Sequence, residues 1–303
     1  MATTLAARWD SPPCPPDRPS RSKPFSRSRT SNPKTHDHMT APVDDSAHPQ
    51  IKLPAVATTR LTVVLGGSLL ALSLIPLSPA IQLDSWLALA AWAVSFSGGW
   101  WGVPVVLALA VGWVATTGTF SRSRSTVAVV VVCGLGLTLV ASARCNEHLL
   151  KPAIGVLRPN FHELARRGVL SSASGLYQVG DKQQRTAELR NRFTIESSAS
   201  LLPSLHPLIR EHWLVHTGYA FPSGHALASF TLATAVTLLG LRLNGRPTWV
   251  TWSFLPWAIL VGWSRCLLRV HSTADVFAGG LIGIVLGLLI AHALTGWATR
   301  QPA

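Results

Sequence analysis

Residues 276–299 have the sequence VFAGGLIGIVLGLLIAHALTGWAT and contain no Asp, Glu, Lys or Arg. A helix needs about 20 such residues to cross the roughly 30 Å hydrocarbon core of a bilayer, and this run holds 24 between Asp275 and Arg300. The flanking charges therefore mark the ends of a predicted membrane span. The same rule, applied outward along the chain, decides the fold class.

Five further spans follow from charge-free runs. Single runs occupy residues 61–83, 125–143, 212–241 and 247–264. The run at 85–121 has 37 residues, too many for one crossing, and is interrupted by Gly98-Gly99-Trp100-Trp101. We therefore expect an amphipathic or interfacial helix near 85–97 and a span near 100–119. The sequence predicts an all-α, polytopic membrane protein with six transmembrane helices in a bundle.

The composition agrees with a membrane protein. Of the 303 residues, 48% are hydrophobic and only 13% are charged, whereas soluble domains have about 25% charged residues. The net charge of +13 does not predict a nucleic-acid binder, because short connections such as 120–125 and 241–247 carry two Arg each. Basic short loops stay in the cytoplasm, so both termini are predicted to be cytoplasmic. The four cysteines lack metal-ligand spacing, and neither zinc nor a disulfide framework is predicted.

The N-terminal region differs from the rest. Residues 1–58 are rich in Pro, Ser, Thr and Arg and lack periodicity, so we expect a disordered, basic cytoplasmic tail before a membrane domain at 59–300. Met39 is an alternative translation start. A signal peptide cleaved after Ala80 is the competing interpretation of the first run, but that run exceeds the about 7 to 15 residues of a signal-peptide core.

Three polar segments fall on one predicted face of the membrane. KPAIGVLRP (151–159) follows the third span, FPSGH (221–225) opens the fourth, and SRCLLRVHSTAD (264–275) joins the fifth to the sixth. Each segment alone has an ordinary structural explanation, such as interfacial basic residues or a serine helix cap. Because the span count brings all three to one face, we interpret them together as one site.

The side chains of these segments suit a phosphate group. Lys151, Arg158 and Arg265 supply three cations for the oxygens of a phosphate monoester. Ser223 and Gly224, at the start of a predicted helix, offer backbone N–H groups and close approach to an anion. No cluster of Asp and Glu accompanies them in the sequence, so no metal site is predicted.

Two histidines complete the predicted chemistry. The i, i+4 spacing of His271 and Asp275 on a predicted helix face puts the carboxylate beside one imidazole nitrogen and leaves the other nitrogen nucleophilic. His225, next to the anion site, can protonate a leaving oxygen. This set of residues predicts phosphoryl transfer through a phosphohistidine.

The pattern K-x6-RP, PSGH, SR-x5-H-x3-D resembles the three-part signature of the type 2 phosphatidic acid phosphatase superfamily. The stretch HW-x3-TGYAFPSGH (212–225) is most similar to its bacterial phosphatidylglycerophosphatase B branch, and the resemblance covers roughly residues 61–297. It implies a six-helix core in the bacterial inner (cytoplasmic) membrane. It also implies a periplasmic phosphate pocket that acts on lipid phosphates without metal or cofactor.

The resemblance also implies a role for each matching residue. His271 is the expected nucleophile, Asp275 its orienting partner, and His225 the general acid and then base. The phosphoryl oxygens are expected to be held by Lys151, Arg158, Ser223, Gly224 and Arg265. Arg269 is not a signature position and has no predicted role.

The long connection at 160–221 is predicted to be a partly helical periplasmic cap over the pocket, with a mobile loop as the alternative. The leading functional hypothesis is a phosphatase for phosphatidylglycerophosphate, phosphatidate or undecaprenyl diphosphate. A phosphotransferase with the same histidine chemistry and a non-catalytic lipid-binding protein are the alternatives. Nothing in the sequence indicates an obligate protein partner.

Overall fold

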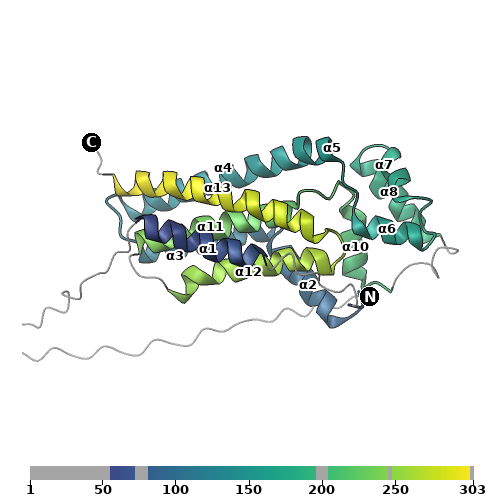
Figure 1. The fold of residues 1–303 in the computed structure, drawn as a ribbon, viewed down its shortest axis with the longest axis horizontal. Helices are drawn as coiled ribbons and strands as arrows, with labels where there is room; N and C mark the ends of the chain where they lie inside the picture. Colours follow the sequence, from purple (N-terminus) through teal and green to yellow (C-terminus); the bar gives the residue numbers. More distant parts are fainter. Residues whose placement is uncertain (1–54, 72–80, 196–203, 245–247, 301–303) are drawn as a thin grey trace, which may run out of the picture. The chain divides into compact units, whose positions relative to one another are not determined.

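A computed structural model describes residues 55–71, 81–195, 204–244 and 248–300, all within the unit that spans Pro49–Ala303. The regular elements of these residues are all helices, so the predicted all-α class is confirmed for them (Figure 1). The elements are α1 (Ala55–Ala71), α2 (Trp86–Ser97), α3 (Gly102–Thr117), α4 (Arg124–Cys145), the π-helix η2 (Asn146–Leu150), α5 (Lys151–Ile154), α6 (Pro159–Arg166), α7 (Ala173–Gln178), α8 (Lys182–Thr194), α10 (Pro207–Val215), α11 (Gly224–Leu243), α12 (Trp249–Leu267) and α13 (Thr273–Thr299).

The predicted division into a tail at 1–58 and a membrane domain at 59–300 stays a prediction. Helix α1 begins at Ala55, inside the stretch assigned to the tail. A charge such as Arg60 ends an apolar run but does not end a helix, since arginine is a good helix former. The rest of the predicted tail, Met39 and the considered cleavage position at Ala80 lie outside the described residues.

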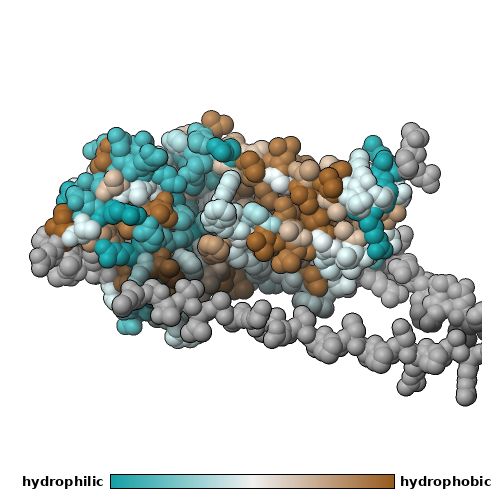
Figure 2. Space-filling view, turned by 180° about the vertical axis from the view of Figure 1, so that it is seen from behind, coloured by the Kyte–Doolittle hydropathy of each residue, from teal (hydrophilic) through white to brown (hydrophobic). Residues whose placement is uncertain are grey.

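Three helical segments are long and apolar enough to cross a membrane: Arg124–Ile154, Gly224–Leu243 and Thr273–Thr299. A fourth is formed if the bent pair α2 and α3 counts as one span. The outer faces of these helices expose large apolar side chains, including Leu137, Leu109 and Leu289. Figure 2 shows apolar side chains gathered over the helices and hydrophilic ones at the ends, the distribution expected of surface that faces lipid. The predicted count of six spans stays a prediction.

The glycine-rich break in the longest charge-free run separates two helices, as predicted. Helices α2 and α3 meet at an angle of 63°. Gly98 lies so close to α12 that a Cβ atom would sit 2.3 Å from Val261 Cγ1. A side chain at this position is therefore excluded by the packing of α2 against α12.

The third predicted span continues further than expected. The helix that starts at Arg124 runs without interruption through η2 and α5 to Ile154, although the charge-free run ends before Arg144. The end of an apolar run marks where a helix leaves hydrocarbon, not where its backbone hydrogen bonds stop. Lys151 consequently lies on the last turns of this helix.

Helix α11 is the buried centre of the bundle and packs along α13 through glycines. A Cβ atom on Gly279, Gly283 or Gly287 would lie 2.4 to 2.7 Å from backbone oxygens of Ser223, Leu227 and Thr231. Glycines four residues apart form one face of a helix, so the two backbones approach closely. This contact fixes the start of α13 against the start of α11, where two of the polar segments lie.

The connection at 160–221 is partly helical, as predicted. Its described helices α6, α7, α8 and α10 gather at one end of the bundle (Figure 1). They share an apolar core with Leu83 and Ala88 from the α2 region and with Leu268 and Val270 from the loop before α13. The helices of the connection are therefore packed onto the ends of the bundle that carry the polar segments.

Candidate active site

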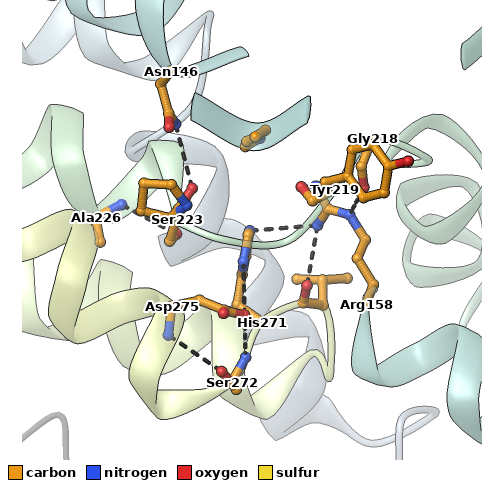
Figure 3. A network of polar contacts seen from close by, with 12 residues as sticks. Asn146, Arg158, Gly218, Tyr219, Ser223, Ala226, His271, Ser272 and Asp275 are labelled. Carbon is orange, nitrogen blue, oxygen red and sulfur yellow. Dashed lines mark hydrogen bonds and ion pairs between the residues drawn. The ribbon is translucent and has the colours of Figure 1, made fainter. Parts of the chain in front are cut away.

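The structure brings the three polar segments together, as predicted. The end of α5, the start of α11 and the α12–α13 loop are joined by hydrogen bonds. Ser223 N donates to Asp275 O at 2.9 Å, and Ala220 N donates to Val156 O at 2.8 Å. Asn146 Nδ2, from η2, donates to Pro222 O at 3.3 Å (Figure 3). Backbone contacts thus fix the relative positions of all three segments.

Arg158 lies at the junction of the segments and is only 3% exposed. Its Nε donates to Gly218 O at 2.6 Å, its Nη1 to Val270 O at 3.1 Å, and its Nη2 to Tyr219 O at 3.4 Å (Figure 3). These acceptors come from the residues before FPSGH and from the residue before His271. One guanidinium from the first segment therefore positions the other two.

Arg265 is completely buried near the end of α12. Its Nη1 donates to Ser95 Oγ of α2 at 2.5 Å and to His212 Nε2 of α10 at 2.8 Å. Its Nε and Nη2 are buried and donate to no atom of the described residues. Arg265 therefore keeps hydrogen-bond donors for a further acceptor.

His271 and Asp275 are close, as predicted, but they do not share the predicted helix face. His271 precedes Ser272, which is the N-cap of α13, and the Asp275 side chain accepts from Ser272 N at 2.7 Å. The distance from His271 Nδ1 to Asp275 Oδ2 is 3.5 Å. A capping box therefore brings the carboxylate beside the imidazole, in place of the helical i, i+4 contact.

The tautomer of His271 follows from its other neighbour. Arg158 Nη1 lies 3.4 Å from His271 Nε2, and a guanidinium can only donate. The Nε2 atom therefore carries the lone pair, and the ring proton belongs on Nδ1, which faces Asp275. Burial and then the positive charges of Arg158 and Arg265 hold the pKa of His271 well below its usual value, so the ring is neutral.

The second segment forms the N-terminus of α11. Ser223 is the N-cap, and its Oγ accepts from Ala226 N at 3.5 Å. Its ordinary structural role as a cap is therefore real, and the positive end of the helix dipole lies in the site as well. His225 occupies the first turn of α11, where a Cβ atom on Gly99 would lie 3.2 Å from its Nε2.

Lys151 is buried, with 6% exposure, and ion-paired. Its Nζ lies 2.6 Å from Glu147 Oε2, one helical turn earlier on η2. Lys151 is one of the positive charges that lower the pKa of His271, after burial and the charges of Arg158 and Arg265. Three cations of the predicted set thus act electrostatically on the predicted nucleophile, and Arg158 also contacts it.

Several residues of this region had no predicted role. Arg269, at a φ of 59°, lies 2.8 and 2.7 Å from the two carboxylate oxygens of Glu163 in α6. Tyr177 Oη of α7 donates at 3.2 Å to Gly218 O, the carbonyl that also accepts from Arg158. Burial raises the pKa of Tyr177, so it remains a donor. His212 begins the stretch at 212–225, but nothing in the sequence around it indicated a contact with Arg265.

The comparisons with known proteins point to one family. A family model described as the PAP2 superfamily matches residues 128–298, which include all three polar segments. The chain is 38% identical over 78 residues to phosphatidylglycerophosphatase B of Escherichia coli K12, covering 26% of this chain and 30% of that protein.

Two other relatives have similar coverage. The lipid A 4'-phosphatase of Bacteroides thetaiotaomicron is 37% identical over 81 residues, which cover 26% of this chain and 34% of that protein. The undecaprenyl-diphosphatase of Sulfolobus acidocaldarius is 41% identical over 73 residues, covering 24% and 32%. The matched part of the chain thus spans about a third of the length of these curated relatives.

Proposed function

The chain belongs to the PAP2 superfamily, and from this premise and the geometry of the site we propose that it is an integral-membrane phosphatase for lipid phosphates. The reaction proceeds without metal or cofactor, through a phosphohistidine on His271. The substrate class is a phosphomonoester or diphosphate of a lipid, such as phosphatidylglycerophosphate, phosphatidate or undecaprenyl diphosphate.

The observation that carries the proposal is the electrostatic state of two arginines. Arg158 and Arg265 are buried, and the described acceptors of their hydrogen bonds are all neutral: backbone carbonyls, a serine hydroxyl and imidazole nitrogens. Burying a cation without an opposite charge is costly. A phosphate dianion supplies that charge, and the guanidinium geometry matches its oxygens. These arginines also supply the positive charge that a metal ion gives other phosphatases.

The first step forms the intermediate. The His271 Nε2 lone pair attacks phosphorus, a P–N bond forms, and the P–O bond to the lipid breaks. His225 gives a proton to the departing lipid oxygen, so the lipid leaves as a neutral alcohol or, from a diphosphate, as a lipid monophosphate. Asp275, beside Nδ1 at 3.5 Å, stabilises the positive charge that develops on the imidazole.

The second step returns the enzyme to its starting state. His225, now neutral, accepts a proton from water, whose oxygen attacks phosphorus while the P–N bond breaks. Inorganic phosphate leaves with the former water oxygen. Lys151, Arg158, Arg265 and the N-terminus of α11 at Ser223 and Gly224 hold the phosphoryl oxygens in both steps.

The lipid nature of the substrate is supported by the position of the site. The polar segments lie at the ends of helices whose outer faces expose apolar side chains (Figure 2). A phosphate on a lipid headgroup is held at such a depth by the bilayer itself. The names of the three relatives also specify lipid substrates, although they differ in headgroup.

The proposed membrane arrangement completes this function. Six spans, built on α1, the α2–α3 pair, α4, α11, α12 and α13, put both termini in the cytoplasm of a bacterium. The site then faces the periplasm from the inner membrane. The connection at 160–221 acts as a cap in this proposal, because its Gly218 and Tyr219 carbonyls accept from Arg158 and its Glu163 pairs with Arg269.

The test is phosphate release by detergent-purified protein in EDTA from the three lipids named above. The expected result is release that His271→Ala abolishes and that His162→Ala, which changes an exposed histidine of α6, leaves intact. Activity that survives His271→Ala refutes the phosphohistidine. Phosphate release that falls when a lipid or sugar acceptor is added, with phosphorylation of that acceptor, identifies a transferase instead.

A further inference from the structure

His212 is the residue of α10 that touches the predicted phosphate site. Its Nε2 lies 2.8 Å from Arg265 Nη1, although the two residues are 53 positions apart. The same Nη1 donates to Ser95 Oγ of α2. The fully buried guanidinium is thus held from two sides by side chains that lie outside the three polar segments.

The direction of the His212 hydrogen bond is fixed by chemistry. A guanidinium has five N–H donors and no acceptor, so His212 Nε2 must carry a lone pair. The imidazole is therefore neutral in this contact. Burial and the neighbouring charges of Arg265 and Arg158 lower the pKa of His212 well below its usual value, in agreement with a neutral ring.

The position of His212 is itself held firmly. The next residue, Trp213, is fully buried and its Nε1 donates to Leu268 O at 2.9 Å, which attaches α10 to the loop before His271. The His216 ring packs against the His212 ring at 4.0 Å, with His216 Nδ1 2.8 Å from His212 O. The imidazole is therefore a rigid acceptor.

We propose that His212 is a positioning residue that orients Arg265 for the substrate phosphate without neutralising its charge. The inference deepens the proposed function and rests on it. Two other cations of this region are paired with carboxylates, Lys151 with Glu147 and Arg269 with Glu163. A carboxylate at Arg265 would compete with the phosphate dianion, whereas a neutral acceptor leaves the full charge and the free Nε and Nη2 donors available.

The length of the side chain provides a sharp test. The Gln side chain puts its amide oxygen at the same number of bonds from Cα as His Nε2, whereas the Asn side chain is one bond shorter. His212→Gln therefore keeps a neutral acceptor in place and His212→Asn removes it. His212→Glu keeps the acceptor position but adds a negative charge. His162→Asn, on the exposed surface of α6, is the matched control.

The first readout is the affinity for inorganic phosphate, measured by calorimetry on the full-length protein in detergent. Because a hydrogen bond to a charged group is lost, we expect the Kd to rise about tenfold or more in His212→Asn. The Kd of His212→Gln stays within about threefold of the wild-type Kd. His212→Glu binds phosphate more weakly than wild type, with an unchanged melting temperature. His212→Leu serves as the variant without an acceptor if His212→Asn does not fold.

The second readout is a double-mutant cycle with Arg265→Ala. If His212 acts through Arg265, His212→Asn costs no further phosphate affinity in the Arg265→Ala background. Equal loss in both backgrounds overturns the proposal, as does His212→Gln binding as weakly as His212→Asn. Wild-type affinity in His212→Glu refutes the requirement for a neutral acceptor.

The two proposals fail in different ways. A wild-type protein that binds phosphate but hydrolyses none of the lipids refutes the proposed function, while the order of the His212 variants still decides the positioning role. A wild-type protein that hydrolyses lipid phosphates, with all His212 variants equally active, refutes only the role of His212. Absence of phosphate binding in wild type overturns the inference on His212.

Discussion

Arg158→Lys is the most informative single substitution, because it keeps the charge and removes the geometry. Arg158 donates through three nitrogens to Gly218 O, Val270 O and Tyr219 O. A lysine ammonium is a single point of charge and cannot reach three diverging carbonyls. The substitution therefore separates the positive charge of the site from the positioning of the segments around it.

The magnitude follows from the bonds that are lost. We expect the lysine to keep the short contact with Gly218 O, at 2.6 Å in the native structure, and to lose the 3.1 Å bond to Val270 O. A hydrogen bond to a charged group contributes about 1.5 to 3 kcal/mol, or about 10- to 150-fold in rate. Because Val270 precedes His271, the loss falls on the position of the nucleophile, and we expect it in kcat/KM.

The assay is phosphate release from phosphatidate in EDTA, with thermal unfolding measured on the same samples. Arg166→Lys, an exposed arginine of the nearby helix α6, is the control and should keep wild-type activity. Activity of Arg158→Lys within threefold of wild type would refute the positioning argument. Equal losses in Arg158→Lys and Arg166→Lys would do the same.

Three further predictions follow from other contacts. Gly99→Ala puts a Cβ atom 3.2 Å from His225 Nε2 and should lower kcat about 3- to 10-fold. Gly112→Ala, whose Cβ atom would have nothing within 4 Å, should leave kcat unchanged, and equal kcat in the two variants contradicts the prediction. Tyr177→Phe removes the 3.2 Å bond to Gly218 O and should cost about 0.5 to 1.5 kcal/mol, or about 2- to 10-fold in kcat/KM, and a wild-type value would show that the phenol does not support Arg158. In the folded protein the pKa values of three buried histidines are lowered from the ordinary 6.5. The unfolded chain therefore binds more protons below pH 6.5, and the free energy of unfolding should fall as the pH is lowered from 7 to 5. Denaturant unfolding in detergent measures this free energy, and a value that is constant over this pH range contradicts the argument. These histidines are His212, His216 and His271.

Most helices of the bundle could be predicted from charge-free runs, because hydrocarbon excludes charge over a fixed thickness. The break at Gly98 and Gly99 was also predictable, since glycines between two apolar helices mark a close approach or a bend. Helix ends were not: α1 extends before Arg60 and the helix from Arg124 extends past Arg144. Backbone hydrogen bonding continues through charged residues after the apolar requirement has ended.

The sequence around His271 contains a signal for a helix start, which contradicts the predicted helical i, i+4 contact with Asp275. Ser272-x-x-Asp275 is a capping-box pattern, which predicts a helix that starts after Ser272. His271 then lies outside the helix, and the 3.5 Å approach to Asp275 comes from the turn before the cap. Spacing alone could not distinguish this turn from a helical i, i+4 contact, because both bring the side chains together.

The contacts of His212, Ser95 and Tyr177 had no such local signal. Their partners lie 53, 170 and 41 positions away, so each pairing depends on how α10, α2 and α7 pack on the bundle. A histidine followed by a tryptophan in a short helix is equally compatible with an ordinary apolar contact. Only the tertiary structure shows that this helix supplies an acceptor to a buried arginine.

The distribution of carboxylates explains how the site remains cationic. Arg269 lies in the loop that follows α12, four residues after Arg265, but it is paired with both oxygens of Glu163 and thereby ties the loop to α6. The charge of Arg269 is thus compensated by an ion pair. The hydrogen bonds of Arg265 within the described residues go to neutral groups. Two arginines four residues apart thus have opposite electrostatic environments. An anion is attracted to the arginine whose charge is not compensated, so the proposed phosphate is expected at Arg265 and not at Arg269.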